Sequence, residues 1–193
     1  YNNFLQKKKY LLYFGQLSRI KGVDLFIDII PKILYQFNDI FFVIVGRDDG
    51  LPNGKSLVHC ISESSKNYSK RIIIRPSLNK SQLYPIIKNS FGVIMPSRVD
   101  NYPNACLEAQ SFGIPVVGTY GSSLDEMIID EETGYLARNG DVNSLYEAII
   151  KLLTLNKKEM NHMKARIINL RKERSSVFFD LLDYYKNIKR IVE

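Results

Sequence analysis

Two short apolar runs, Tyr10-Leu-Leu-Tyr-Phe-Gly15 and Phe41-Phe-Val-Ile-Val-Gly46, each end at a glycine and enclose one amphipathic segment. Within that segment, Val23–Phe37, apolar residues recur at steps of three and four, which is the period of an α-helix. We expect Pro31 to kink or split this helix, because proline removes a backbone hydrogen bond. Neither apolar run alternates with polar residues, and such strands suit a sheet that helices cover on both faces. Residues 10–46 therefore predict a β-α-β unit with parallel strands.

The same alternation of apolar runs and helical segments continues along the chain. We expect further strands at Ile72–Ile74, Phe91–Met95, Pro115–Gly118 and Tyr135–Ala137, and helices at 57–65, 81–89, 104–112, 125–129 and 142–155. The polar residues 48–70 predict a loop that leads into the first of these helices. From residue 157 to the end the sequence predicts helix, with a break near Ser175-Ser176. The expected fold class is therefore α/β, a doubly wound, Rossmann-like parallel sheet with C-terminal helices.

Length and composition fit one domain. The chain has 193 residues, 45% of them hydrophobic, which is enough material for one buried core. The longest apolar run, Ile40–Val45, is far shorter than the roughly 20 residues of a membrane span. No signal peptide is visible, and the two cysteines, Cys60 and Cys106, favour reduced thiols in the cytoplasm. We expect a single domain over 1–193, with a core at about 10–155 and C-terminal helices at 157–193.

The net charge of +7 is concentrated near the C-terminus. Residues 151–193 have a balance of +6, whereas residues 1–150 have a balance of +1. This charge fits solvated helix faces, and it also fits contact with a partner or with the anionic inner face of a membrane. No nucleic-acid-binding module is recognisable, so we expect no nucleic-acid partner.

The turn after the first expected strand is one candidate for a binding site, because ligands of doubly wound sheets lie beyond the carboxyl ends of the strands. It reads Gly15-Gln-Leu-Ser-Arg-Ile-Lys-Gly22. Gly15 permits a tight exit from the strand, Lys21 adds a positive charge, and Gly22 lets the backbone come close to a phosphate. The same residues also fit an ordinary turn between a strand and a helix, so the pattern alone leaves both interpretations open.

A second candidate follows the fourth expected strand and reads Asp100-Asn-Tyr-Pro-Asn-Ala-Cys-Leu-Glu108. Pro103 fixes the loop, and we expect Asn104 to cap the helix that begins there. Carboxylates at Asp100 and Glu108 can bind sugar hydroxyls, and the free N–H groups at a helix N-terminus can bind a phosphate. Ordinary polar positions around a loop remain the alternative. His59 and His162 belong to no ligand cluster, so we expect no metal site.

Taken together, these motifs resemble the C-terminal, donor-binding domain of retaining glycosyltransferase family 4, the group 1 glycosyltransferases of the GT-B fold. The matching pieces keep the order and spacing of the family over roughly residues 10–155. They are Gly15–Asp24, Val43–Gly46, Met95–Ser97, Asp100–Val117, Gly121–Glu126, Glu132–Tyr135 and Gly140-Asp141.

The resemblance implies catalytic roles for Lys21, Asp100 and Glu108. Lys21 would hold the diphosphate of the donor, Asp100 would contact the hydroxyls of the donor sugar, and Glu108 would accept hydrogen bonds from the ribose. Gly15 and Gln16 would lie beside the diphosphate, and Gln16 stands where the family has an arginine. The loss of that charge predicts weaker donor binding unless Arg19 or Arg47 replaces it, and the short Asp100 side chain could indicate a different sugar.

The remaining implied contacts are to the sugar, the diphosphate and the base of the donor. Backbone groups of Tyr102, Pro103, Asn104 and Ala105 would lie along the sugar and the diphosphate. The base would stack near the turn after the third strand, around Ser77 and Leu78.

The resemblance implies a metal-independent hexosyltransferase of glycan or polysaccharide biosynthesis, with a UDP- or GDP-linked sugar as donor substrate and no cofactor. Because the chain begins at Tyr1 and the family carries its acceptor site on a preceding N-terminal domain, we expect that domain to be missing and the fragment alone to be inactive. Two other functions stay open: a non-catalytic module that binds nucleotide sugars, and a domain that contacts a partner or a membrane through its basic tail.

Overall fold

The computed structural model describes residue 5 and residues 7–173. Within them, six parallel strands form the central sheet in the spatial order β5-β3-β1-β6-β7-β8. The strands are β1 (Lys9–Phe14), β3 (Ile40–Val45), β5 (Ile72–Arg75), β6 (Gly92–Ile94), β7 (Val116–Thr119) and β8 (Gly134–Ala137). Each lies within one residue of a strand expected from the sequence. The doubly wound parallel sheet is therefore confirmed, and its chain order reverses between β1 and β6.

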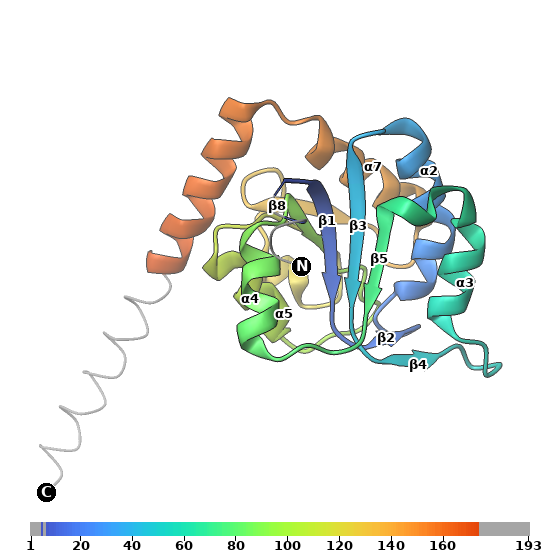
Figure 1. Ribbon diagram of the computed structural model, residues 1–193. Helices are drawn as coiled ribbons and strands as arrows, with labels where there is room; N and C mark the ends of the chain where they lie inside the picture. Colours follow the sequence, from blue (N-terminus) through green and yellow to red (C-terminus); the bar gives the residue numbers. More distant parts are fainter. Residues whose placement is uncertain (1–4, 6, 174–193) are drawn as a thin grey trace, which may run out of the picture.

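Helices cover both faces of the sheet, as the uninterrupted apolar strands predict (Figure 1). One face carries α2 (Phe26–Gln36), α3 (Leu57–Ser64) and α7 (Val142–Thr154), and Met160, Met163 and Ile167 of the following helix join its core. The other face carries α4 (Lys80–Lys88), α5 (Asn104–Ser111) and α6 (Leu124–Met127). Further along the helix that contains Met160, Ile168 lies beside Gly113, after α5. Successive residues of β1 show the alternation: Leu11 and Tyr13 join the first core, whereas Leu12 and Phe14 join the second.

Helix α2 runs through Pro31 without interruption, so the predicted split of this helix is wrong. A short 3-10 helix, η1 (Val23–Leu25), leads into it. The buried apolar side chains of α2 lie on both sides of the proline, at Phe26, Ile29, Ile30, Ile33 and Leu34. Their packing on the sheet outweighs the loss of one backbone hydrogen bond.

The expected loop at 48–70 also needs correction, because it begins with a strand. Strand β4 (Asp48–Gly50) pairs with β2 (Leu17–Ser18) in a small parallel ribbon beyond the carboxyl ends of β1 and β3. The Leu17 N–H donates to the carbonyl of Arg47 over 2.8 Å. Further along, residues 66–71 form a second 3-10 helix, η2 (Lys66–Arg71). The ribbon ties the first candidate loop to the end of the neighbouring strand.

Residues 157–173 are attached to the rest of the domain. Met160, Met163 and Ile167 are buried in the first core, whereas the basic residues Lys157, Lys158 and Lys172 are exposed, so the expected contact of this segment with a partner or a membrane stays a prediction. The expected break near Ser175-Ser176 lies outside the described residues. Among the residues that the structure describes, no helix is long and apolar enough to cross a bilayer. The location of the protein and its single-domain extent over 1–193 stay predictions.

The two candidate loops meet at Gly22. This glycine has a φ of 70°, and a Cβ added to it would lie 1.8 Å from the carbonyl oxygen of Pro96. Just before the ribbon, where β1 and β3 end, a Cβ on Gly46 would lie 1.7 Å from the carbonyl oxygen of Gly15. Glycine is therefore required at both positions, since no side chain fits between these backbones.

Replacement of Gly22 by alanine tests this close approach. Gly54 is the matched control, because it has a φ of 80° and no atom within 4 Å of an added Cβ. We expect Gly54→Ala to lower the free energy of unfolding by about 1 kcal/mol, the cost of a left-handed backbone alone. Gly22→Ala should lower it by about 2 to 4 kcal/mol, because overpacking adds to that cost. Equal losses for the two variants in urea unfolding would refute the steric account.

Candidate functional site

A cleft of about 310 Å³ opens where the strand order reverses, beyond the carboxyl ends of β1 and β6. This is the place where doubly wound sheets bind ligands. Residues from both candidate loops line it: Gly15, Gln16, Lys21, Ser97, Asp100, Asn101, Tyr102, Pro103, Asn104 and Ala105, together with Tyr13, Phe14 and Met95 at the strand ends. The structure thus brings together residues that lie about 80 positions apart in the sequence.

Lys21 and Asp100 form the central contact of the cleft. Lys21 Nζ lies 2.8 Å from Asp100 Oδ1, and the side chains are 29% and 8% exposed. Two further donors hold the same carboxylate: Ser97 Oγ donates to Oδ2 over 3.0 Å, and the Asn101 N–H donates to Oδ1 over 3.1 Å. The positive charge of the cleft is therefore already paired with a fixed negative charge.

Tyr13 stays protonated beside this ion pair. Burial raises the pKa of its hydroxyl, and the negative charge of Asp100 raises that pKa further. The hydroxyl donates to the carbonyl of Gln16 over 2.6 Å. Tyr13 therefore fixes the backbone of the first loop immediately after Gly15.

The sequence did not single out Ser97 as a site residue. Its hydroxyl is buried and positions Asp100, and its carbonyl accepts a hydrogen bond from Thr119 Oγ1 at the end of β7. Thr119 in turn is 3.0 Å from Ser122 Oγ. The position of Ser97, directly after a buried strand and three residues before Asp100, is the sequence signal that could have found it.

Arg98 joins the two loops through side-chain contacts. Its guanidinium binds both carboxylate oxygens of Asp24, over 2.6 and 2.9 Å, and donates to the carbonyl of Arg19 over 2.6 Å. Bidentate pairs of this kind hold geometry more strictly than a single contact does. The clamp fixes the turn that carries Lys21.

Pro103 is the N-cap residue of α5, and Asn104 is the first helical residue, so the prediction that Asn104 caps this helix is wrong. The reason is that the proline already supplies the extended backbone (φ −65°, ψ 124°) of a cap position. The preceding residue, Tyr102, has a φ of 50°, and its N–H donates to Ser123 Oγ over 2.8 Å. The N-terminus of α5, with its first N–H groups, thus borders the cleft.

The two remaining predicted residues, Glu108 and Leu78, do not line the cleft. Glu108 lies one turn further along α5, and its carboxylate is 3.8 Å from Lys80 Nζ at the start of α4. Leu78 packs against the second core.

At the rim of the cleft, Gln16 belongs to a polar network with the ribbon. Its side-chain amide donates to Asp49 Oδ2, and Asp49 Oδ1 accepts from Arg47 Nε over 2.8 Å. The hydrogen bonds from Arg47 and then from Gln16 lower the pKa of the Asp49 carboxyl.

The neighbouring Asp48 anchors α3. Its carboxylate accepts from Ser56 Oγ over 2.6 Å and from the N–H groups of Leu57 and Val58 over 3.2 and 3.1 Å. Partial burial alone would raise the pKa of Asp48, but these hydrogen bonds and one from the Gly50 N–H outweigh it and lower the pKa. The ribbon is thereby tied to the first turn of a helix.

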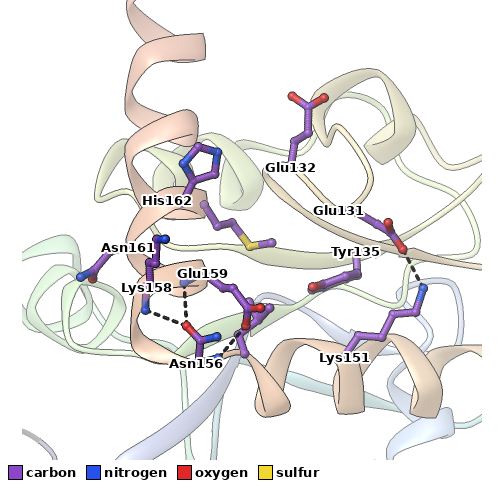
Figure 2. A pocket seen from close by; sticks show the side chains of 11 residues that line it. Glu131, Glu132, Tyr135, Lys151, Asn156, Lys158, Glu159, Asn161 and His162 are labelled. Carbon is purple, nitrogen blue, oxygen red and sulfur yellow. Dashed lines mark hydrogen bonds and ion pairs between the residues drawn. The ribbon is translucent and has the colours of Figure 1, made fainter.

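A larger hollow of about 900 Å³ lies elsewhere, between the segment before β8, the end of α7 and the helical residues 157–163 (Figure 2). Figure 2 shows Glu131 facing Lys151, which it pairs with over 2.8 Å. Asn156 accepts from the N–H groups of Lys158 and Glu159 and so caps the helix. This hollow is at the amino end of β8, whereas ligands of doubly wound sheets bind beyond the carboxyl ends of the strands, and we therefore place the candidate site in the smaller cleft.

Among the described residues, no three His, Cys, Asp or Glu side chains gather in a group that could hold a metal ion. Neither Cys60 nor Cys106 forms a disulfide within the described part of the chain.

The model of the family described as "Glycosyl transferases group 1" matches residues 2–170. The chain belongs to the group 1 glycosyltransferases. Among the curated relatives is 2-deoxystreptamine N-acetyl-D-glucosaminyltransferase of Niallia circulans. The two sequences are 23% identical over 154 residues, and the match covers 76% of this chain and 36% of the relative. The chain spans little more than a third of the length of the curated relatives it matches first.

Solved structures of glycosyltransferases share the fold. The C-terminal domain of a glycosyl transferase group 1 family protein from Francisella tularensis has a TM-score of 0.71 at 18% identity, covering 86% of this chain and 86% of that domain. TarM of S. aureus, in complex with fondaparinux, α-GlcNAc-glycerol and UDP, has a TM-score of 0.74 at 18% identity, covering 91% of this chain and 35% of TarM. The group 1 chain thus has the Rossmann-like fold of GT-B glycosyltransferases.

The anchoring of α3 by Asp48 predicts a dependence of stability on pH. Because the folded-state pKa of Asp48 is lowered, its carboxylate stabilises the fold above the unfolded pKa of about 3.9, and this stabilisation is lost as pH falls through the folded pKa. We expect Asp48→Asn to lower the free energy of unfolding by about 1 kcal/mol at pH 7 and by progressively less below pH 4. Urea unfolding at pH 7, 4 and 3 measures the difference.

Asp39→Asn is the matched control, since Asp39 is exposed in the turn before β3. It should leave the unfolding free energy unchanged across this pH range. A difference between wild type and Asp48→Asn that is the same at pH 7 and pH 3 would exclude the carboxylate as the anchor.

Proposed function

We propose that this chain is the donor-binding half of a retaining glycosyltransferase of family 4, which moves a hexose from a UDP- or GDP-linked donor to an acceptor hydroxyl. The observation that carries the proposal is the cleft at the reversal of strand order, where Lys21 and the N-terminus of α5 converge. Both features bind anions, and the diphosphate is the anionic part of such a donor. The acceptor side belongs to a part of the protein outside this chain.

The relatives support a nucleotide sugar as ligand. TarM has UDP bound in its structure, and the relative from Niallia circulans transfers N-acetylglucosamine. This chain covers 36% of the relative from Niallia circulans and 35% of TarM, and the proposal assigns the acceptor site to a further domain.

The leaving diphosphate sets the main chemical requirement of the reaction. When the bond between sugar and phosphate breaks, negative charge grows on the diphosphate oxygen. Lys21, which also contacts Asp100, and the first N–H groups of α5 lie beside the cleft and stabilise that charge. These contacts supply electrostatic stabilisation from the chain itself, and the proposal requires no metal ion.

Asp100 orients the donor sugar in this proposal. Its carboxylate is held by Lys21, Ser97 and Asn101, so it can accept hydrogen bonds from sugar hydroxyls at a fixed position. Glu108 would accept from the ribose, and the base would lie near Ser77 and Leu78. Backbone groups of Tyr102–Ala105 border the space between these two ends.

Replacement of Lys21 tests the diphosphate site. We expect Lys21→Ala to weaken binding of UDP or GDP at least tenfold in calorimetry, a loss of about 1.4 kcal/mol. The reason is twofold, since the variant loses a cation and leaves the Asp100 carboxylate unpaired near the phosphates.

Lys151→Ala is the matched control, because Lys151 also forms an ion pair of 2.8 Å but lines the hollow at the amino end of β8. It should bind UDP and GDP as wild type does. The proposal is wrong if wild type binds neither nucleotide, or if Lys21→Ala binds them unchanged.

A further inference from the structure

The candidate cleft holds less positive charge than a diphosphate needs. Of the described residues that line it, Lys21 alone carries a positive charge, and its ammonium group already contacts Asp100. A diphosphate carries more negative charge than one shared ammonium group neutralises. If the proposed function holds, on which this inference rests, a second cation must lie within reach of the cleft.

The ribbon brings one arginine to the rim of the cleft. Strand β4 pairs with β2, and the Leu17 N–H donates to the carbonyl of Arg47. The backbones at Gly15 and Gly46 are in direct contact, which leaves no room for a side chain between them. Residue 47 is therefore fixed beside the backbone of Gln16, a residue that lines the cleft.

The side chain of Arg47 is linked to the same cleft residue through Asp49. Arg47 Nε donates to one oxygen of Asp49, and the Gln16 amide donates to the other. This contact uses one N–H of the guanidinium, and the two terminal nitrogens carry four more. The Arg47 side chain is 76% exposed, so a planar group with one edge on a carboxylate presents its other N–H groups to solvent or to a ligand.

Other cations near the cleft lack the link to its lining that Arg47 has. Arg98 binds Asp24 in a bidentate pair and donates to the carbonyl of Arg19. Lys80 lies beside Glu108, away from the lining of the cleft. Arg19 is exposed on the first loop, and within the described residues its side chain contacts neither Gln16 nor any other side chain that lines the cleft.

We propose that Arg47 is a second diphosphate-binding residue of this cleft, aligned by Asp49 and, through Asp49, by Gln16. The guanidinium bridges the Asp49 carboxylate and a phosphate of the ligand. In this arrangement Gln16 is a positioning residue. It carries no charge itself, but through Asp49 it holds the positive charge of Arg47 beside the first loop.

The test compares binding of UDP and GDP with binding of uridine and guanosine to the 193-residue chain. Arg47→Ala should weaken binding of the diphosphate at least fivefold and leave binding of the nucleoside unchanged, because only the phosphates contact the guanidinium. Arg47→Lys should recover little, since an ammonium group cannot bridge the carboxylate and the phosphate in a plane. Arg19→Ala is the matched control and should bind both ligands as wild type does.

Two further variants test the alignment. Gln16→Ala should weaken diphosphate binding about twofold in the wild-type background and have no effect in the Arg47→Ala background, because it acts through Arg47. Gln16→Arg should restore diphosphate binding to Arg47→Ala by placing a cation directly on the first loop.

Three results would overturn the inference: unchanged diphosphate binding by Arg47→Ala, an equal loss of nucleoside and diphosphate binding, or a loss in Arg19→Ala as large as in Arg47→Ala. These failures differ from failure of the proposed function, in which wild type binds neither nucleotide or Lys21→Ala has no effect. A chain in which Lys21 is required and Arg47 is not would keep the diphosphate site and refute the role of Arg47.

Discussion

The clamp between Arg98 and Asp24 holds together the two loops on which the candidate site is built. Its bidentate geometry, with a further hydrogen bond to the carbonyl of Arg19, joins the turn after β1 to the turn after β6. The contact of Gly22 with Pro96 brings the same two turns to backbone distance. Because the strand order reverses between β1 and β6, no crossover helix fills the space there, and the clamp defines the walls of the cleft.

Ion pairing sets the electrostatic character of this cleft. Lys21 pairs with Asp100, Arg47 pairs with Asp49, and Lys80 lies beside Glu108, so carboxylates accompany the cations at and around the site. A diphosphate that enters must share these cations with resident carboxylates, which limits affinity and favours ligands whose hydroxyls can use the same carboxylates. A nucleotide sugar offers both anionic oxygens and hydroxyl donors. The charge arrangement thus suits the nucleotide sugar of the proposed function.

The sequence predicted the sheet well because buried parallel strands such as Phe41–Val45 are continuous apolar runs. It also predicted the positions of the two candidate loops, because each loop directly follows such a run. It missed the β2–β4 ribbon, since Leu17-Ser18 and Asp48–Gly50 are short and have no apolar pattern. The pairing of Arg98 with Asp24, 74 positions apart, leaves no local signal either. Periodicity reports burial, whereas contacts between polar side chains of distant loops depend on the tertiary fold.

The central claim is that the ligand binds at the reversal of strand order, and an NMR titration of the labelled chain with UDP and GDP tests it most directly. The account predicts that amide shifts change at 15–22 and at 100–105, on the two sides of the cleft. Amides at 131–135 and 155–163, around the larger hollow, should not shift. Shifts that cluster around the larger hollow, with none at the cleft, would contradict the account.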